Sequence, residues 1–478
     1  MKDTKANEAS QDLDREFAST TTLHGIGQVI DNQRVAVKLV WLGLLLGCMG
    51  VCSFQIIDRV KSYLEYNAST SLSVNYVGDL RFPAVTICNF NRYRKTALAN
   101  ESSWQLKYAL SAADYDYDSY DDRVNVSEPD SRYNFSYGAF TRRTGFIMDN
   151  PSLLACSWRG KNGSCSADKN FTHSFTSFGN GWTFNSGSEN QSEILSQFQS
   201  GSGNGLQLMI DIQEFEYTET IDGNVEAGLK LLVHDQLTPT LAVDSVGLAI
   251  APGVHAFIAV RQIKHLNLEP PWGDCSKDKQ LEYYPGYTLE GCTVECRARA
   301  IKKECGCRLV RHPGDAPECL PEAVEDCATP TLMKMKSGEI AQCDCPIPCN
   351  YTEYSTALST ARLPNKNVAW DFANLYKFDY ISEYYIRDNC MMIDIYYDTM
   401  NYQVYKQSQA ITTSALISDV GGQLGLFVGA SFITLAEIIF YIARKVRVLM
   451  CTNKIKPSRD DVINIQGMAE KGHEGPVS

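Results

Sequence analysis

The chain has 478 residues, with 44 lysines and arginines against 56 aspartates and glutamates, and a formal net charge of −12. This acidic balance argues against nucleic acid as a partner and suits cations, either as permeant ions or as bound calcium. The sequence holds no HExxH, GxSxG or P-loop motif, and its seven histidines form no ligand pair at helical or strand spacing. We therefore expect neither an enzyme, nor a resident metal, nor a cofactor.

A first apolar run extends from Leu39 to Ile57, after a polar tail over residues 1–38. Because a helix of roughly 20 apolar residues crosses a bilayer, the run predicts a transmembrane helix over residues 39–60. A secretory signal would begin closer to the N-terminus and end in a small-residue cleavage site, and this run has neither feature.

Residues 61–413 form a long loop with the features of an extracellular domain. All eight Asn-x-Ser/Thr sequons lie within it, at Asn67, Asn100, Asn125, Asn134, Asn162, Asn170, Asn190 and Asn350. Fourteen of the 17 cysteines also lie there, ten of them between Cys275 and Cys349. Their CxxxC and CxC spacings favour a disulfide framework in an oxidising compartment over a zinc cluster.

Within this loop, alternating apolar segments predict strands, and longer patterns predict helices. The predicted strands are Phe82–Cys88, Leu206–Ile212, Leu229–His234, His255–Val260 and Cys390–Tyr397. Helices are expected after Cys292 and over Val368–Leu375, so the fold class is α+β. The segment Ala113–Asp122 interleaves five aspartates with three tyrosines. We expect an exposed insertion there, with calcium binding or tyrosine sulfation as alternatives.

A second apolar run, Ala415–Ala443, differs from a plain membrane anchor. Asp419 stands near its start and Glu437 near its end, and carboxylates inside a membrane usually face a water-filled path. Glycines recur at every fourth residue, at Gly421, Gly425 and Gly429. Such a stripe lets other helices approach closely, so we predict a pore-lining transmembrane helix over residues 414–443.

Two spans place both ends of the chain on the same side of the membrane. Arg34 and Lys38 precede the first span, and Arg444, Lys445 and Arg447 follow the second. Because basic flanks stay in the cytoplasm, we expect both tails, residues 1–38 and 444–478, to be cytoplasmic in a protein of the plasma membrane.

Several motifs occur in a fixed order along the chain. They are His24-Gly25, FPAVTICN from Phe82, TFNSG at Thr183–Gly187, Pro271-Trp272-Gly273, HPGDAPEC at His312–Cys319 and GGQLGLFVGAS at Gly421–Ser431. With these motifs, the chain resembles the degenerin/epithelial sodium channel family from about Phe17 to Arg447. Within that family it is most similar to the branch of acid-sensing and bile-acid-sensitive channels.

The resemblance implies a trimer of identical or paralogous subunits. Each subunit would have two transmembrane helices and a hand-shaped ectodomain with a palm β-sheet and thumb helices over the cysteine-rich residues 275–349. The second helix would line the pore, and Gly429, Ala430 and Ser431 would interrupt it to form the belt that selects sodium. A ring of Asp419 side chains would mark the outer mouth.

Other positions match the family's gating and blocking residues. Ser418 matches a small-residue gating position, and Gly421 and Gly422 match the region where amiloride blocks. His24 and Gly25 match a cytoplasmic gating motif. Tyr66 and Trp272 match an aromatic contact that couples the ectodomain to the membrane helices.

The resemblance also implies a set of disulfides. The pairs are Cys156–Cys165, Cys275–Cys349, Cys292–Cys345, Cys296–Cys343, Cys305–Cys327 and Cys307–Cys319. Gly181 stands where the family has the usual partner of Cys88, and Cys390 replaces an aliphatic residue of the last strand. We therefore predict a substitute Cys88–Cys390 disulfide.

Departures from the family concern the gating stimulus. Asn67 and Ala68 stand in place of a histidine pair, and residues of an acidic pocket are replaced by Thr329, Met333 and Gln199. Nearby acidic candidates remain at Glu219, Asp222 and Glu226. The segments Arg261–Lys264 and Ile301–Cys307 look more like the bile-acid-sensitive relatives.

We therefore expect a sodium channel whose stimulus stays open. Protons, peptides, bile acids or other amphiphiles, membrane lipid and relief of calcium block are the alternatives. Rival readings of the topology are a two-span scavenger-type receptor, a two-span ectoenzyme and an ATP-gated trimer. The receptor would need neither Asp419 nor the glycine stripe, and the ectoenzyme would need a catalytic constellation that the sequence lacks. The ATP-gated trimer would lack the Gly429-Ala430-Ser431 motif and would need basic residues for phosphates.

Overall fold

The computed structural model of the chain describes residues 12–31, 34–100, 135–162, 164–187, 193–218, 224–340, 342–368, 371 and 383–453. The chain divides into two compact units. The helical unit lies within Met1–Asn67 and Gln409–Ser478, and the sheet unit is Ala68–Ser408. The predicted insertion Ala113–Asp122 and most of the predicted helix Val368–Leu375 lie outside the described residues.

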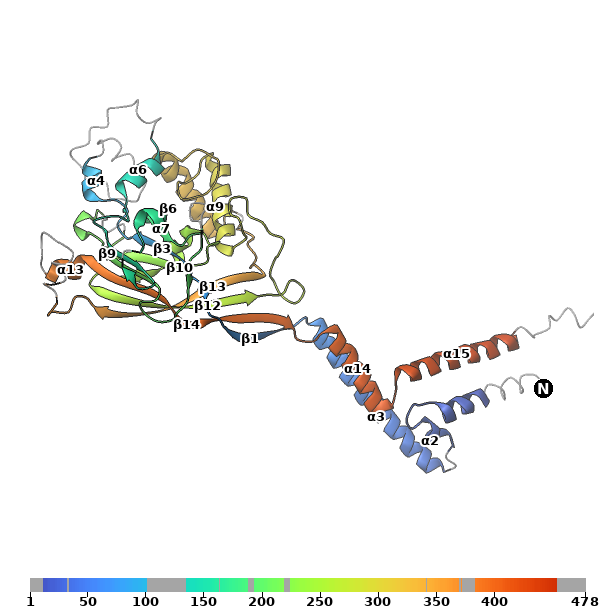
Figure 1. Cartoon of the computed structure of the whole chain (residues 1–478). Helices are drawn as coiled ribbons and strands as arrows, with labels where there is room; N and C mark the ends of the chain where they lie inside the picture. The colour runs from blue at the N-terminus through green and yellow to red at the C-terminus, as the bar shows by residue number, and fades with distance from the viewer. Residues whose placement is uncertain are drawn as a thin grey trace, which may run out of the picture. The chain divides into compact units, whose positions relative to one another are not determined.

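The larger sheet of the sheet unit has seven strands. Six follow the order β13-β12-β14-β9-β4-β5, and β1 pairs with β14 beside this path. The strands are β1 (Ala68–Tyr76), β4 (Leu153–Trp158), β5 (Lys161–Asn162), β9 (Leu206–Asp211), β12 (Val254–Leu266), β13 (Asn350–Arg362) and β14 (Cys390–Gln409). The long strands β12, β13 and β14 lie side by side, with β12 parallel to β14 and antiparallel to β13 (Figure 1). Three predicted strands are thus confirmed in β9, β12 and β14.

A second sheet has five strands in the order β11-β10-β3-β7-β6, and β2 and β8 form a separate pair. The strands are β2 (Leu80–Arg81), β3 (Ala84–Asn89), β6 (Phe171–Thr176), β7 (Gly179–Phe184), β8 (Ser196–Gln197), β10 (Leu229–His234) and β11 (Leu248–Ile250). The predicted strand Leu229–His234 is confirmed as β10. The predicted strand Phe82–Cys88 is divided, because Pro83 has no N–H for a ladder and separates β2 from β3.

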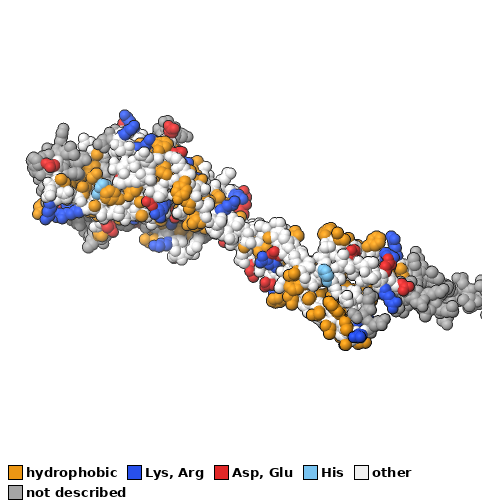
Figure 2. Space-filling model, turned by 60° about the horizontal axis from the view of Figure 1, so that its bottom comes forward, with side chains coloured by type: hydrophobic (Ala, Val, Ile, Leu, Met, Phe, Trp, Pro, Cys, Tyr) orange, Lys and Arg blue, Asp and Glu red, His pale blue; other side chains and the backbone are white. Residues whose placement is uncertain are grey.

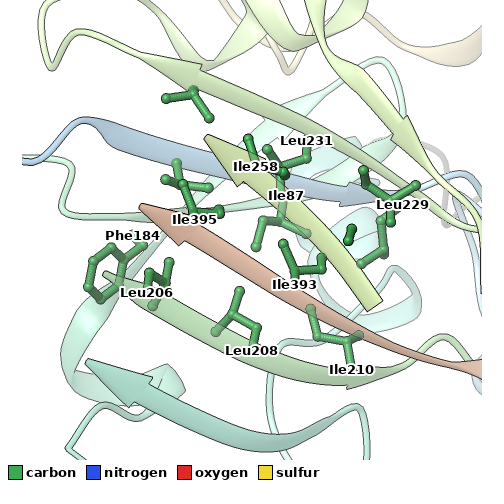
Figure 3. Packing of buried hydrophobic residues seen from close by; sticks show 14 of the residues in the cluster. Ile87, Phe184, Leu206, Leu208, Ile210, Leu229, Leu231, Ile258, Ile393 and Ile395 are labelled. Carbon is green, nitrogen blue, oxygen red and sulfur yellow. The ribbon is translucent and has the colours of Figure 1, made fainter. Parts of the chain in front are cut away.

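Side chains from both sheets fill one apolar core. Strands bury every second residue on one face. In β12, Ala256, Ile258 and Val260 are buried in this way. Figure 3 shows how residues of β3, β9, β10 and β14 meet there, with Ile87, Leu208, Leu231 and Ile393 among them. This core holds the strands in fixed register.

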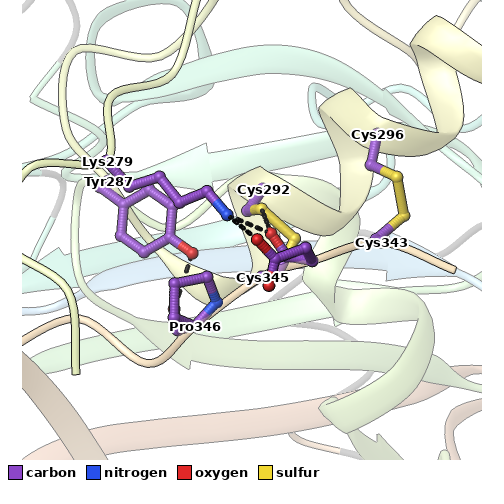
Figure 4. A network of polar contacts seen from close by, with 8 residues as sticks. Lys279, Tyr287, Cys292, Cys296, Cys343, Cys345 and Pro346 are labelled. Carbon is purple, nitrogen blue, oxygen red and sulfur yellow. Dashed lines mark hydrogen bonds and ion pairs between the residues drawn. A yellow bond between two sulfur atoms is a disulfide. The ribbon is translucent and has the colours of Figure 1, made fainter. Parts of the chain in front are cut away.

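Helices and disulfides form a compact segment beside the sheets. The helices are α9 (Leu289–Cys305), α10 (Pro321–Ala323), the π-helix η5 (Val324–Ala328) and α11 (Thr329–Ser337). Thr288 begins α9, because its hydroxyl accepts a hydrogen bond from Gly291 N at 3.0 Å. Figure 4 shows two disulfides joining α9 to the chain around Asp344, beside an ion pair of 2.8 Å between Lys279 Nζ and Asp344 Oδ2. The predicted helix after Cys292 is therefore confirmed.

Shorter helices connect the strands. They are α4 (Lys95–Ala99), α6 (Tyr137–Thr144), α7 (Ala167–Asn170), η3 (Glu214–Glu216), η4 (Thr240–Ala242), α8 (Val243–Val246) and α13 (Glu383–Asn389). In Figure 1, α6 and α9 lie near one another on the same side of the sheets.

Six of the seven predicted disulfides are present: Cys156–Cys165, Cys275–Cys349, Cys292–Cys345, Cys296–Cys343, Cys305–Cys327 and Cys307–Cys319. The predicted Cys88–Cys390 disulfide is wrong, because both are free thiols. Cys88 lies in β3 of the five-stranded sheet, whereas Cys390 lies in β14 of the seven-stranded sheet. Each thiol is buried in its own apolar cluster, so the two cannot meet.

The helical unit contains α2 (Ile26–Asp31), α3 (Val35–Leu64), α14 (Thr413–Val428) and α15 (Phe432–Asn453). Residues 12–20 are also helical. Among the described residues, α3 alone is a single helix long and apolar enough to cross a membrane. α14 and α15 meet the same criterion only when they are taken together as one broken span.

Candidate functional site

The second apolar run is broken into two helices. α14 ends at Val428, Gly429 caps it in a left-handed conformation (φ +70°), and α15 begins at Phe432. The bend between the two helices is 71°. A left-handed residue ends an α-helix, and glycine adopts this conformation without a steric penalty. The interruption expected at Gly429, Ala430 and Ser431 is therefore present.

The break frees two backbone carbonyl groups. The carbonyl oxygens of Gly429 and Ala430 accept no hydrogen bond from any described residue. Ser431 instead begins α15, since its hydroxyl accepts a hydrogen bond from Thr434 N at 3.2 Å. Carbonyls without partners at membrane depth are tolerated where they line a cavity, and rings of such oxygens coordinate cations in channels. The break can therefore supply ligands to a passing ion.

The segment before the first span packs directly against this break. His24 N donates a hydrogen bond to the carbonyl of Val428 at 3.0 Å. A Cβ added to Gly429 would overlap the His24 imidazole ring. Gly25 has a φ of +87°, a backbone conformation that residues with a Cβ rarely adopt. The structure thus brings the His24-Gly25 motif to the break, a proximity that the sequence motif alone does not reveal.

Glu437 is held by the same N-terminal segment. Its Oε2 accepts hydrogen bonds from Thr22 N at 3.2 Å and from the hydroxyls of Thr21 and Thr22 at 3.4 Å each. The Thr22 hydroxyl also lies 2.5 Å from that of Thr434, whose side chain is fully buried. The carboxylate of Glu437 therefore anchors the segment that carries His24.

A second contact fixes the start of this segment. Asp14 Oδ1 accepts hydrogen bonds from Lys445 Nζ at 2.8 Å and from the hydroxyl of Tyr441 at 2.6 Å. Glu16 forms a further ion pair with Arg444 at 3.2 Å. Sequence reasoning missed this clamp, because opposite charges at the two ends of a chain leave no local pattern.

Small residues of α14 form an exposed face. Ser418, Gly421, Gly422 and Gly425 are all exposed, and their spacing places them on one side of the helix. A Cβ on Gly421 or Gly422 would meet no atom within 4 Å. The bare face predicted from the glycine stripe is therefore open for contact with other helices or with a pore.

Much of the surface of the helical unit is apolar. Figure 2 shows hydrophobic side chains gathered along its helices. Leu39 and Phe54 of α3 and Phe432 and Phe440 of α15 are among the most exposed. An apolar surface of this extent is typical of helices that face lipid or other helices.

The predicted outer-mouth residue has a counter-charge within its own chain. Arg59 Nε of α3 lies 2.6 Å from Asp419 Oδ2 of α14. The side chain of Asp419 is 36% exposed and that of Arg59 is 48% exposed. The negative charge of Asp419 is therefore partly offset within the chain, which the sequence did not indicate.

Buried histidines of the sheet unit are poor proton sensors. Burial lowers the pKa of His234 to about 4 and that of His312 to about 3. Burial has the opposite effect on carboxylates, and it raises the pKa of Asp211 and of Asp244. These two aspartates gain protons more readily than exposed ones, so they join the candidate acid-sensing groups, although nothing in the sequence singles them out.

The remaining predicted residues are placed as follows. Glu226 is exposed, and Glu219 and Asp222 lie outside the described residues. Tyr66 belongs to the helical unit and Trp272 to the sheet unit, and their contact stays a prediction.

Glycosylation also stays a prediction. The sequon asparagines Asn67, Asn100 and Asn350 are exposed, and Asn170 is half-buried. The backbone of Asn162 lies in β5. The other three sequons, at Asn125, Asn134 and Asn190, lie outside the described residues.

Comparison with known proteins gives a consistent result. The family described as amiloride-sensitive sodium channel matches residues 17–441. The chain is 32% identical to acid-sensing ion channel 1 of Gallus gallus, over 91% of this chain and 84% of that protein. It is 33% identical to acid-sensing ion channel 2 of Homo sapiens, over 89% and 85%. It is also 33% identical to the bile acid-sensitive ion channel of Mus musculus, over 90% and 87%.

Proposed function

Because this chain belongs to the amiloride-sensitive sodium channel family, we propose that it forms a sodium-selective, ligand-gated cation channel that amiloride blocks. Three copies, or this chain with related subunits, surround the pore. Each chain crosses the plasma membrane twice and keeps both tails in the cytoplasm. Membership in a family of ion channels leaves the rival receptor and ectoenzyme readings without support.

The observation that carries the proposal is the break in the second span. The carbonyl oxygens of Gly429 and Ala430 have no hydrogen-bond donor among the described residues, and Ser431 presents an exposed side chain beside them. Three such breaks around an axis give stacked rings of oxygen ligands, which is how channels replace the hydration shell of a cation. We assign the selectivity belt to these three residues.

The face of α14 above the belt fits the rest of the pore. Ser418, Gly421, Gly422 and Gly425 leave space where a blocker or a neighbouring helix approaches. We assign amiloride block to the region of Gly421 and Gly422 and gating to Ser418. Asp419 then contributes charge at the mouth, reduced by its pairing with Arg59.

We assign control of the belt to His24 and Gly25. The hydrogen bond from His24 N to Val428 and the close fit of the imidazole against Gly429 support this assignment. Movement of the N-terminal segment would alter the backbone at the belt, because the two share a hydrogen bond.

Two stimuli are favoured by particular observations. Protons are favoured by the relatives named as acid-sensing and by the raised pKa of Asp211 and Asp244. The same pore without proton gating is favoured by Asn67 and Ala68 and by the likeness to a relative named as bile acid-sensitive. Extracellular calcium block and peptide gating belong to this second alternative.

The test is whole-cell current from cells that express this chain alone. External pH is stepped from about 7.4 to about 5 before amiloride is added. Ser418→Phe gives a version of the test that needs no agonist, because bulk at this position should hold the pore open. Ile417→Phe is the matched control on the neighbouring face of α14.

We expect an amiloride-blocked sodium current from Ser418→Phe and not from Ile417→Phe. A changed sodium-to-potassium permeability ratio is expected in Ser431→Ala. A Ser418→Phe chain that reaches the cell surface yet carries no current would contradict the proposal. Acid-evoked current in the unmodified chain would select protons, and its absence would select the second alternative.

A further inference from the structure

A cavity in the helical unit lies between the helix of residues 12–20 and α15. Its volume is about 380 Å³, within the range of roughly 300–1,000 Å³ that small-molecule sites occupy. Three aromatic side chains line it, those of Phe17, Phe440 and Tyr441, together with the aliphatic side chain of Leu13. The rings of Phe17 and Tyr441 are stacked, with their centroids 4.3 Å apart. The cavity therefore has the room and the apolar surface to hold a small organic molecule.

One charge in this lining has no counter-charge. Glu437 lines the cavity, and no described side chain forms an ion pair with it. Its hydrogen bonds come from the hydroxyls of Thr21 and Thr22 and from Thr22 N, which are neutral donors. Because a carboxylate at membrane depth is costly, such groups usually pair with a cation or face water. Glu437 can therefore accept a cation that enters the cavity.

The other two charged groups of the lining neutralise each other. Glu16 and Arg444 both line the cavity. Arg444 Nη1 donates a hydrogen bond to Glu16 Oε1 at 3.2 Å, and Arg444 Nη2 donates one to Glu16 Oε2 at 3.3 Å. The lining thus has two carboxylates, Glu16 and Glu437, against one guanidinium, and its net charge is −1.

Aromatic rings beside an uncompensated carboxylate favour an organic cation. An ammonium group is attracted both to a carboxylate and to the faces of aromatic rings, and cages of aromatic side chains recognise quaternary ammonium ligands. A hydrated sodium ion would leave the apolar wall of the cavity unused. An anion would be repelled by Glu437. The lining therefore selects a molecule that has one positive charge and an apolar part.

From this lining we propose that the cavity binds a free hydrophobic ammonium compound, with its charged head at Glu437 and its apolar part against Phe17 and Phe440. The bound molecule would connect the N-terminal helix to α15 and so hold the segment that carries His24. The site is defined by contacts within one chain and does not depend on the channel proposal.

The test is calorimetric titration of the purified full-length chain with benzyltrimethylammonium chloride, in a sugar detergent that carries no ammonium group. Benzyl alcohol is the neutral comparison ligand, and phosphocholine represents a lipid headgroup, which has the ammonium but no ring. The variants are Glu437→Gln, which removes the charge, and Phe440→Leu, which removes one aromatic wall. Phe432→Leu is the matched control, because Phe432 is 89% exposed on α15 and lies outside the lining. Glu65→Gln removes an exposed carboxylate of the same unit.

Benzyltrimethylammonium should bind saturably, with the same Kd in the unmodified chain and in both controls. Its Kd should rise about tenfold in Glu437→Gln, because the charged head loses its counter-charge. In Phe440→Leu the Kd should rise about threefold. Benzyl alcohol should bind equally to Glu437→Gln and to the unmodified chain, because it carries no charge. Weaker binding of both ligands would show that the substitution collapses the cavity, and it would overturn the role of Glu437.

If Glu437→Gln fails to fold, the comparison of Phe440→Leu with Phe432→Leu decides the question. The proposal is overturned if benzyltrimethylammonium shows no saturable binding or has the same Kd in Glu437→Gln and the unmodified chain. It is also overturned if phosphocholine binds as tightly, since the site would then fit a lipid headgroup.

Discussion

Arg59 and Asp419 form an ion pair of 2.6 Å between α3 and α14 within one chain. Both side chains are more than a third exposed, so the pair contributes little to stability, where exposed pairs are worth about 1 kcal/mol or less. Its larger effect is on the field at the proposed mouth. In the proposed trimer, Arg59 would reduce the negative potential that three Asp419 side chains create.

Arg59→Gln should therefore strengthen block by extracellular calcium. We expect the half-blocking concentration to fall by about threefold to tenfold, because removing a neighbouring cation is worth on the order of 1 kcal/mol at an effective surface dielectric. Asp419→Asn should weaken the block, and the double variant should behave like Asp419→Asn. The measurement is the calcium dependence of amiloride-blocked current. Equal block in Arg59→Gln and the unmodified chain would show that Arg59 does not shield the mouth.

Gly429→Ala should disrupt the belt for two reasons. The new Cβ would overlap the His24 ring, and the left-handed backbone at Gly429 costs a residue with a Cβ about 1–2 kcal/mol. We expect reduced current and a lower sodium-to-potassium permeability ratio. The double variant His24→Ala/Gly429→Ala should recover part of the loss, because only the backbone strain remains.

Gly47→Ala is the matched control, since a Cβ there would meet no atom within 4 Å. Loss of selectivity in this control would show that the effect is not specific to Gly429. No recovery in the double variant would show that overlap with His24 does not cause the loss.

Gly181→Cys should create a disulfide with Cys88. The two positions face each other in β3 and β7, and a Cβ at Gly181 would lie 3.2 Å from Cys88 Sγ. Cross-links of this kind typically stabilise by about 2–4 kcal/mol. Burial raises the pKa of Cys88 to about 12, so thiols are labelled after denaturation. Cys88 should be labelled in the unmodified chain and protected in Gly181→Cys.

The control for this experiment is Gly181→Ser. A Cβ at this position also approaches Thr176 Cγ2 at 2.9 Å, so serine should lower the Tm, because it introduces the crowding without the bond. Labelling of Cys88 in Gly181→Cys would contradict the prediction.

His234 and His312 should make the sheet unit less stable in acid. Their pKa values of about 4 and about 3 lie below the ordinary value of about 6.5. Between these values and about pH 6.5, the two histidines are protonated in the unfolded chain but neutral in the folded chain. The free energy of unfolding therefore falls as pH drops below about 6.5, by about 2 kcal/mol per histidine at pH 5. Asp211 and Asp244 act in the opposite direction, because their pKa values are raised.

His234→Gln isolates one of these contributions. Its Tm should fall less than that of the unmodified chain between about pH 7.4 and pH 5, and the difference between the two curves removes the effect of the aspartates. Parallel curves would mean that His234 does not titrate on unfolding.

Local pattern in the sequence was enough for individual elements. Leu229–His234 was confirmed as β10 without change, because a short, mostly apolar run between Gly228 and Asp235 predicts a buried strand. The order of the strands within the sheets could not be predicted from these local patterns. Cys88 and Cys390 are in different sheets, so the disulfide predicted from their being the two remaining cysteines could not form.

In the candidate site, too, the sequence predicted local features but not the contacts between distant residues. The glycines of the second span indicated a helix with a bare face, and the structure has that face. The partners of its charged residues come from elsewhere in the chain. Arg59 of α3 pairs with Asp419 of α14, and Thr22 of the N-terminal segment donates a hydrogen bond to Glu437. Contacts between residues so distant in sequence depend on tertiary packing, which no single window of sequence contains.

The order of strands in the larger sheet determines when this sheet can fold during translation. β14, which ends at Gln409, lies between β12 and β9 and also pairs with β1, the first strand of the sheet unit. The five-stranded sheet, by contrast, is complete once translation has passed Ile250. The smaller sheet can therefore assemble before translation of the chain is complete. The cysteine-rich segment, residues 275–349, can fold after it. The larger sheet must wait for its last strand, and until then β1 and β9 present unpaired edges to chaperones or to neighbouring nascent chains.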